Sequence, residues 1–393
     1  MTIQLSRRNF LKTLALTAAS FGLGNVGRRA PLKSIAQADP PLIPRAFLPL
    51  IYRNDNSLWG RVIHIQNLQA TASWNGEANY WEYVNQSAVD GMVDRGVTEL
   101  TGAATRADAW SRLLPSFQPG QKVAIKINLN NSRSCGTPNT VIDALIQPVN
   151  AVVKGLEEIG VLRQDISVYD AVRAIPQRLI LGGLSGIQFF DDGCNNAAGF
   201  SSASDAYIPF EPPAGMTMPS ERVSNALVDA AYLINMPIMK GGHPLANVTL
   251  GLKNHFGTIH NCAALHNYVN VVGKPRGYTS TYNPLVDFLR SPHIGGKHVL
   301  TIGDALFAAR AFSQKPQPWT TFDNKVPNSL FFATDPVAVD CVMHDFIGAE
   351  VGPLVTDSNR YLQLAAEAGF GEYESVDPWT EAYSLIQYSR VNL

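Results

Sequence analysis

Hydrophobic and polar positions along the chain follow two periods, and the pattern predicts strands that alternate with helices. Short apolar runs predict strands at residues 122–129, 166–169, 187–190, 231–236, 298–302 and 330–333. Helical spacing predicts helices over residues 85–96, 138–160, 244–256 and 336–347, with Pro148 expected to kink or split the second. The alternation favours an α/β fold with a mainly parallel sheet and helices on both faces.

The first 38 residues have the order of features that is typical of an export signal. An arginine pair at Arg7 and Arg8 precedes a mild apolar run, residues 14–26, and a small-x-small site at residues 36–38. This order predicts a twin-arginine signal peptide over residues 1–38, with the twin-arginine translocase as partner during export and an extracytoplasmic location afterwards. An uncleaved anchor and a basic arm are the alternatives, although about 13 apolar residues are short for a membrane span. No stable span is expected in the mature form.

The remaining chain is expected to consist of a short arm and one domain. Residues 39–60 contain four prolines and predict an extended linker or a surface arm. Residues 61–393 then form a single α/β domain. Of the 393 residues, 46% are hydrophobic and 16% are charged, which suits a globular protein.

Charge narrows the classes of partner. The leader holds six of the 31 basic residues and no acidic one, which leaves 25 basic against 32 acidic residues and a net charge of −7. Nucleic acid and anionic membrane surfaces need a basic footprint, so neither is expected as a partner. A local basic pocket for a small anionic ligand is compatible with this balance.

Four cysteines, at positions 135, 194, 262 and 341, lie far apart in the chain. No C-x-x-C pair occurs, so neither a cysteine-ligated zinc nor an iron-sulphur cluster is expected. Disulfides are permitted outside the cytoplasm, but the spacing does not say which cysteines pair, and four unpaired cysteines remain the alternative.

Polar residues at the ends of predicted strands are the first candidates for a site, because ligands of parallel α/β sheets bind at the carboxyl ends of strands. Lys126, Asn128 and Asn130 alternate along one strand and therefore share a face. A lysine buried there needs a charged or hydrogen-bonding partner. The pattern predicts an anion site, or alternatively an edge strand with a solvated polar face.

A second candidate cluster follows the strand at residues 231–236. Lys240 and His243 lie in a glycine-containing turn before the predicted helix, whose free amides favour anions. His243, Asn247 and Asn254 are four and seven residues apart and would share one helical face, with Lys253 beside them. Histidines 255, 260 and 266 have spacings of five and six, and we interpret them as structural or surface residues.

Carboxylates form the third candidate set. Asp335 precedes Pro336 and is expected to cap the helix that follows. Asp304 follows a predicted strand, and Asp340 lies within a predicted helix. If His243, Asp304 and Asp340 met in space, they would form an oxygen-rich site for a divalent metal or for acid–base chemistry.

These stretches resemble a known family, the bacterial and archaeal proteins grouped as domain of unknown function 362. The matching stretches are residues 123–129, 233–237 with Lys240 and His243, 252–257, 303–305 and 335–340. They span roughly residues 121–350. The resemblance implies little chemistry, because the family's activity is not generally established. Some relatives carry an iron-sulphur module, but this chain lacks the cysteine run, so no such cluster is expected.

The sequence therefore predicts an exported enzyme that acts on a small anionic or carbonyl substrate, with a divalent metal as a candidate cofactor. Lys126 and Lys240 would neutralise charge, His243 would act as acid, base or metal ligand, and Asp304 would orient or ligate. Further ligand-binding candidates are Asn128, Asn130, Asn247, Lys253 and Asn254. The alternatives are a non-catalytic extracytoplasmic binding protein for a small anion or metal, and a surface interaction protein tethered by the arm.

Overall fold

The computed structural model describes residues 58–129 and 140–393. The predicted signal peptide, most of the predicted arm and Asn130 lie outside the described residues. No helix in the two described ranges is both long enough and apolar enough to cross a membrane.

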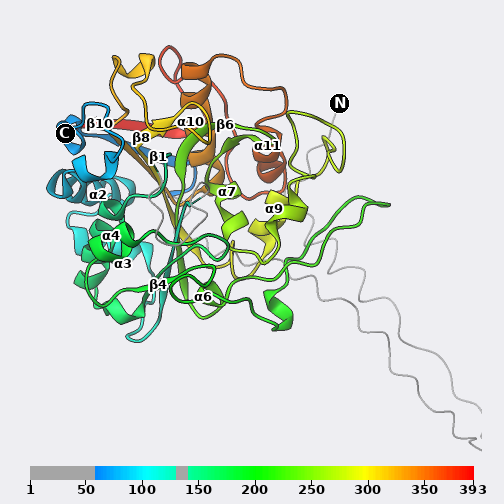
Figure 1. Ribbon diagram of the computed structural model, residues 1–393, viewed down its shortest axis with the longest axis horizontal. Coiled ribbons are helices and arrows are strands. Elements are labelled where there is room, and N and C mark those ends of the chain that lie inside the picture. Colours follow the sequence, from blue (N-terminus) through cyan, green and yellow to red (C-terminus); the bar gives the residue numbers. More distant parts are fainter. Residues whose placement is uncertain (1–57, 130–139) are drawn as a thin grey trace, which may run out of the picture. The chain divides into compact units, whose positions relative to one another are not determined.

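Within the described ranges, ten strands form one sheet that runs through the protein (Figure 1). Eight of them follow the order β10 (Gln387–Asn392), β1 (Arg61–Gln66), β9 (Ser329–Ala333), β8 (His298–Ala309), β5 (Tyr232–Met236), β2 (Val123–Ile127), β3 (Ile166–Tyr169) and β4 (Gln188–Phe190). The strands β8, β5, β2, β3 and β4 are parallel, whereas β9 is antiparallel to both of its neighbours. The predicted α/β class with a mainly parallel sheet is confirmed.

Helices pack on both faces of the sheet (Figure 1). One face carries α2 (Gln86–Thr101), α3 (Arg106–Leu113) and α4 (Ile146–Glu158), and the other carries α7 (Gly251–Asn254), α9 (Pro284–Arg290), α10 (Pro336–Val351) and α11 (Arg360–Glu367). Each face of the sheet has its own hydrophobic core, and β2 contributes to both because its side chains point alternately to the two faces. Ile125 and Ile127 point to the α4 side, and Ala124 points to the α10 side.

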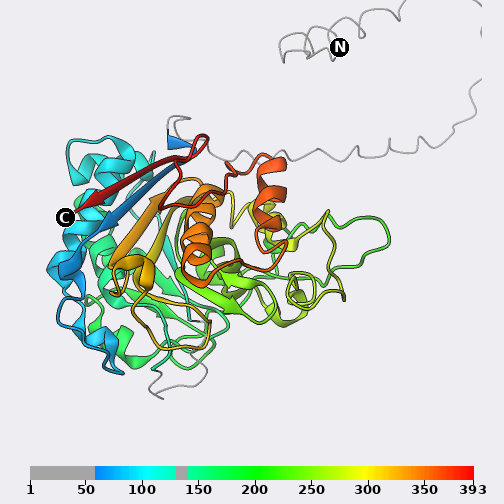
Figure 2. The ribbon, with the colours of Figure 1, turned by 90° about the horizontal axis from the view of Figure 1, so that it is seen from above.

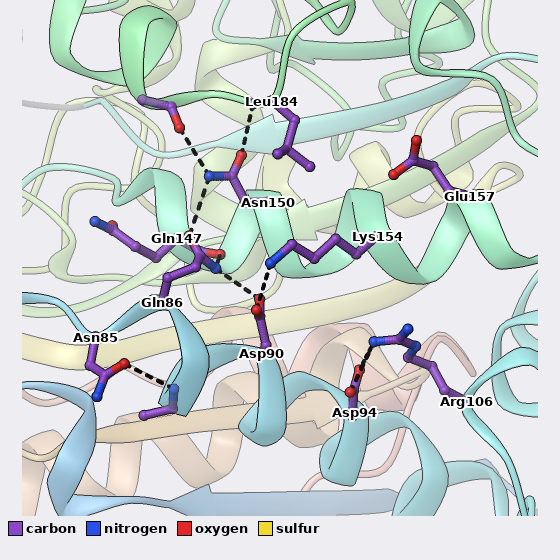
Figure 3. Close-up of polar contacts among 12 residues, drawn as sticks. Asn85, Gln86, Asp90, Asp94, Arg106, Gln147, Asn150, Lys154, Glu157 and Leu184 are labelled. Atoms are coloured by element: carbon purple, nitrogen blue, oxygen red, sulfur yellow. Dashed lines mark hydrogen bonds and ion pairs between the residues drawn. The ribbon is translucent and has the colours of Figure 1, made fainter.

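The contact between α2 and α4 is polar along its outer rim (Figure 3). Lys154 of α4 donates to Asp90 of α2 at 2.5 Å, and Asn150 donates to Gln86 at 3.3 Å. These side chains satisfy one another, so this rim fixes how the two helices pack and offers no group for a ligand.

Two predicted helices differ from the structure. The helix expected over 138–160 begins only at Ile146, which puts Pro148 in the first turn, where its missing N–H breaks no helical hydrogen bond. The helix expected over 244–256 is wrong for its first half. That stretch continues β6 (Ile238–His243) as a hairpin with β7 (Asn247–Thr249), since Asn247 at φ 64° supplies the turn. Only α7 and a 3-10 turn, His255–Gly257, remain helical.

The first and last strands of the described chain pair with each other. Residues 61–66 of β1 align in parallel with residues 387–392 of β10, and Figure 2 shows the two strands side by side at the edge of the sheet. The weak sequence pattern predicted neither strand.

The helix that follows β9 begins as expected. Asp335 accepts hydrogen bonds from the amides of Val337 and Ala338 at 2.9 Å each, and Pro336 occupies the first helical position. Asp335 also accepts from the amides of Gly60 and Glu372, so its carboxylate joins α10 to the segments at both ends of the described chain.

Candidate functional site

The candidate site begins with a buried ion pair at the carboxyl ends of β2 and β3. Lys126 of β2 is fully buried, and its Nζ donates to Asp170 Oδ2 at 3.0 Å, directly after β3. The same Nζ donates to Ile127 O at 2.6 Å and to Asn254 Oδ1 at 3.2 Å. Burial lowers the pKa of Lys126, and the neighbouring Asp170 carboxylate opposes that shift. The lysine thus has the partners that a buried ammonium requires.

A chain of buried side-chain amides links this ion pair to the next lysine. Lys240 Nζ donates to Asn128 Oδ1 at 2.6 Å, and Asn128 Nδ2 donates to Asn254 Oδ1 at 3.0 Å. Asn254 Nδ2 donates to Asn235 Oδ1 at 2.8 Å, and Asn235 Nδ2 donates to Gly251 O at 3.0 Å. Every amide oxygen in this chain faces a donor, so the network holds α7 rigidly against β2, β5 and β6.

Lys253 of α7 lies in a different environment from Lys126. Its Nζ is 3.3 Å from His266 Nε2 and 3.8 Å from the centre of the Phe256 ring. Burial lowers the pKa of Lys253 to about 7, and Lys240 and Arg173 add to the effect. No carboxylate of the described ranges lies within ion-pairing distance of Lys253.

Two histidines complete the same region, and both are neutral near pH 7. His266 Nδ1 lies 2.9 Å from Cys262 O and donates to it, which leaves Nε2 as an acceptor for Lys253. His243 stacks on His266 at 5.7 Å, and its Nδ1 accepts from the amides of Leu245 and Ala246. Burial lowers the pKa of His266 to about 4 and that of His243 to about 2. We interpreted His266 from sequence as a structural or surface residue, but it borders the site.

Lys253 and His266 border a small cavity of about 30 Å³. Its lining residues are Asn128, Asp170, Val172, Arg173, Thr249, Lys253, Asn254, Phe256, Gly257, Cys262 and His266. Val172, Arg173 and Cys262 are half-buried, so the cavity reaches the surface at that side. Only the head group of a ligand fits inside.

Two lining residues, Arg173 and Thr249, escaped the sequence analysis. The guanidinium of Arg173 makes no ion pair or hydrogen bond within the described part of the chain. Thr249 is 3% exposed, and its Oγ1 has no hydrogen-bond partner among the residues that the structure describes. Arg173 follows the end of β3 by four residues, so the rule that led to Lys126 could have found it and Asp170 as well. Thr249 could not be found from the sequence by this rule, because its position next to the cavity depends on the β6–β7 hairpin, which pairs it with Lys240.

The charges around the cavity do not balance. Lys253 and Arg173 line it, and Lys126 and Lys240 donate to its lining residues Asp170 and Asn128, whereas Asp170 is the carboxylate among the lining residues. Burial lowers the pKa of Lys240 to about 8, and Asp143 partly offsets that shift from beyond ion-pairing distance. The site therefore carries an excess of buried positive charge.

Asp304 does not join this group. The prediction placed it after a strand, but β8 continues to Ala309, so Asp304 lies within the strand. It lies on the same face of β8 as Ile302 and Leu306, which pack on the α4 side. Its Oδ1 accepts a hydrogen bond from the amide of Leu306 at 3.0 Å. Lys126 points to the opposite face. Burial raises the pKa of Asp304 to about 7.

Asp340 and Asn247 also lie outside the cavity. Asp340 accepts from the amides of Gly251 and Leu252 at 2.7 and 2.9 Å, so it caps α7 from α10. Burial raises the pKa of this carboxyl to about 7. Asn247 Oδ1 accepts from the amide of Val355 at 2.9 Å. Asp340 therefore positions the helix that carries Lys253 and has no contact with a ligand.

The predicted metal ligands His243, Asp304 and Asp340 do not gather their ligand atoms in one place. Within the described ranges, three such atoms come within 4.8 Å of one another at Asp191, Asp192 and Cys194. Cys194 is in a disulfide, which removes its thiolate as a ligand, while Cys262 and Cys341 are free. Asp191 Oδ1 already accepts from two backbone amides of the turn that follows it. Asp191 thus stabilises the turn that follows it.

Comparison with known proteins agrees with the resemblance and adds no activity. No curated protein matches the chain. The family model described as Domain of unknown function (DUF362) matches residues 123–345, the stretch that supplies Lys126, Asp170, Lys240 and Lys253 to the site. This match covers more than half of the residues of the chain, and the chain therefore belongs to the DUF362 family.

Proposed function

We propose that the protein is an enzyme that holds a small anionic substrate in the cavity that Lys253 and Arg173 line, with Lys240 behind the lining residue Asn128. The observation that carries this proposal is the group of buried cations without carboxylate partners. Lys240 has a neutral amide as its hydrogen-bond acceptor, and Lys253 has a neutral imidazole. The anion supplies the negative charge that the site lacks.

Energetics favours an anion over a neutral ligand. A buried ammonium without a counter-charge costs several kcal/mol, and the two lysines express this cost as lowered pKa values. A carboxylate or phosphate head group repays part of that cost through charge-assisted hydrogen bonds. It also gives the Thr249 hydroxyl an acceptor.

A non-catalytic binding protein is the second candidate. It is favoured by the histidines, because His243 and His266 have pKa values of about 2 and 4 and are poor proton donors or acceptors for catalysis near pH 7. A binding protein needs only the positive charge of the lysines to hold an anion and does not need a group that transfers protons. In either case we propose export through the twin-arginine leader, for which the order of residues 1–38 is the support.

Calorimetric titration tests the anion site. The panel is inorganic phosphate, acetate and pyruvate, each titrated at pH 7 in a constant background of sodium chloride. We expect at least one of them to bind, and Lys253→Met to weaken it by about tenfold or more, because Lys253 lines the cavity and a hydrogen bond to a charged group contributes about 1.5–3 kcal/mol. Methionine keeps the volume and apolar stem of lysine, so the variant should fold.

The matched control is Lys154→Met, which removes a lysine from the half-exposed pair with Asp90. This variant should bind as the unaltered protein does. If no anion binds, or if both variants bind equally well, the proposal is wrong. NMR spectra of the bound anion after long incubation separate the two candidates, since an enzyme converts the anion and a binding protein returns it unchanged.

A further inference from the structure

We infer that Lys253 is an amine nucleophile that forms an imine with the carbonyl group of a small 2-oxo acid. This inference rests on the proposed function and adds the reaction and the class of substrate. It follows from the position of Lys253, from the groups around its Nζ and from the basic residues beside it.

The position of Lys253 is fixed by the contacts that hold its helix, α7. The short helix α7 is held by Asp340, which caps its first amides, and by Asn254, which binds the amide network. The Lys253 side chain is 5% exposed and borders the cavity. Its Nζ therefore approaches a bound head group without first losing much conformational freedom.

The surroundings of Lys253 favour a neutral amine. Its Nζ is buried and has no carboxylate partner in the described ranges, and its hydrogen-bond partner is the lone pair of the neutral His266 Nε2, while a cation–π contact of Nζ with the Phe256 ring acts in the opposite direction. His266 cannot turn that nitrogen into a donor while Nδ1 donates to Cys262 O. The titratable and charged groups around Lys253 are Lys240, Arg173, His243, His266, the thiol of Cys262 and, across the cavity, the Asp170 carboxylate that is paired with Lys126.

Charge on the amine sets how much nucleophile is present. With a pKa of about 7, about half of the Lys253 side chains are neutral at pH 7. An ordinary lysine with a pKa near 10.4 is neutral in only about one molecule in 2,500 at that pH. Burial beside other cations is a known way to activate a lysine towards carbonyl compounds.

The basic residues next to Lys253 fit the acid group of a 2-oxo acid. Arg173 offers a guanidinium that has no partner in the described ranges, and its fork suits a carboxylate. Thr249 offers a buried hydroxyl without a partner. In a 2-oxo acid the carboxylate and the carbonyl are adjacent, so one small head group reaches both the guanidinium side and Lys253.

The reaction balances without a further reactant. The neutral Nζ attacks the carbonyl carbon, and the new C–N bond gives a carbinolamine. The carbinolamine loses its hydroxyl with one proton as water, and a C=N bond replaces C=O. Amine and carbonyl compound therefore yield imine and water, with no oxidation or reduction. The neutral imine then takes up one proton from solvent, and the adjacent substrate carboxylate stabilises the charge of the protonated form.

Reductive trapping tests this inference on the full chain. The protein is incubated with pyruvate and sodium cyanoborohydride at pH 7, and the adduct is located by intact mass and peptide mapping. We expect one reduced pyruvate per chain on Lys253, none on Lys253→Met and unchanged labelling of Lys154→Met. Acetate, which has no ketone, should slow the labelling but leave no adduct.

The pH dependence of trapping gives a second measurement that needs no variant. The initial labelling rate should rise with pH and reach half its maximum near pH 7, the pKa of Lys253. Lys297 is the internal control, because burial lowers its pKa to about 8 while its Nζ is held by the carbonyl oxygens of Leu227 and Val228.

The outcomes separate the inference from the proposed function. Pyruvate that binds by calorimetry without forming an adduct ends the inference and leaves the anion site standing. An adduct that maps to Lys297 or is spread over surface lysines also ends it. If neither pyruvate nor another anion of the panel binds, the proposed function fails first.

Discussion

Replacement of Asp170 by asparagine removes the carboxylate that contacts Lys126. The two side chains are 4% and 0% exposed, and 3.0 Å separates Nζ from Oδ2. The variant keeps the size of the side chain and leaves a buried ammonium with neutral acceptors. It therefore measures the cost of an uncompensated charge at the centre of the candidate site.

We expect the free energy of unfolding to fall by about 3 kcal/mol. Removal of one partner of a buried ion pair costs about 3–5 kcal/mol, and the lower end applies because Lys126 retains Ile127 O and Asn254 Oδ1 as acceptors. The matched control is Asp90→Asn, whose partner Lys154 is 2.5 Å away but 35% exposed. That variant should lose less than about 1 kcal/mol, although its pair is the shorter one.

Urea unfolding at 25 °C, followed by circular dichroism, measures both variants. The double variant Lys126→Met with Asp170→Asn removes both charges and should recover most of the loss. Burial already holds the native pKa of Lys126 below its unfolded value, and loss of Asp170 lowers it further. The penalty therefore shrinks as rising pH deprotonates Lys126 in the variant. Equal losses for Asp170→Asn and Asp90→Asn, or no recovery in the double variant, would refute this reasoning.

Four further substitutions test other parts of the structure. Asp340→Asn should cost about 1–3 kcal/mol in urea unfolding and weaken anion binding, since it disturbs the cap of α7; normal stability would contradict this role. Asp304→Asn should become more stable relative to the unaltered protein as pH rises from 4 to 8, by up to about 4 kcal/mol. The native pKa of Asp304, raised to about 7, makes the stability of the unaltered protein decline over that range. Parallel pH profiles of the two proteins would contradict this reasoning. Gly257→Ala would put the new Cβ 2.5 Å from Lys126 Nζ and should abolish anion binding; binding that survives would contradict the close packing. The control Gly91→Ala, with open space around it in α2, should stabilise the protein by about 0.5–1 kcal/mol.

Much of the fold could be predicted because local and global preferences agree. The parallel strands are apolar on both faces, as β2 shows with five buried residues in a row, and such runs are visible in sequence. The cap at Asp335 depends on adjacent residues alone. The strand-end rule found Lys126, Asn128 and Lys240, which the structure brings into one hydrogen-bonded network with Asn254.

The parts that could not be predicted depend on contacts between distant segments. Asp304 looked like the residue after a strand, because nothing in the sequence shows that β8 runs on for 12 residues to pair with β6 and β9. The stretch 244–256 has apolar residues at helical spacing, but pairing of β7 with β6 outweighs that preference. Strand β10 is largely exposed and has little apolar pattern, so only its partner β1 defines it.

The pairing of β1 with β10 bears on how the chain completes its fold. Strand β1 lies between β9 and β10, so one of its two hydrogen-bonding edges is satisfied by residues 387–392, which follow it by more than 300 residues. During synthesis that edge stays open until residues 387–392 have also been made. A chain truncated before residue 387 would leave β1 as an unpaired edge that can recruit strands from other molecules, so such chains should aggregate even though every residue of the candidate site is present.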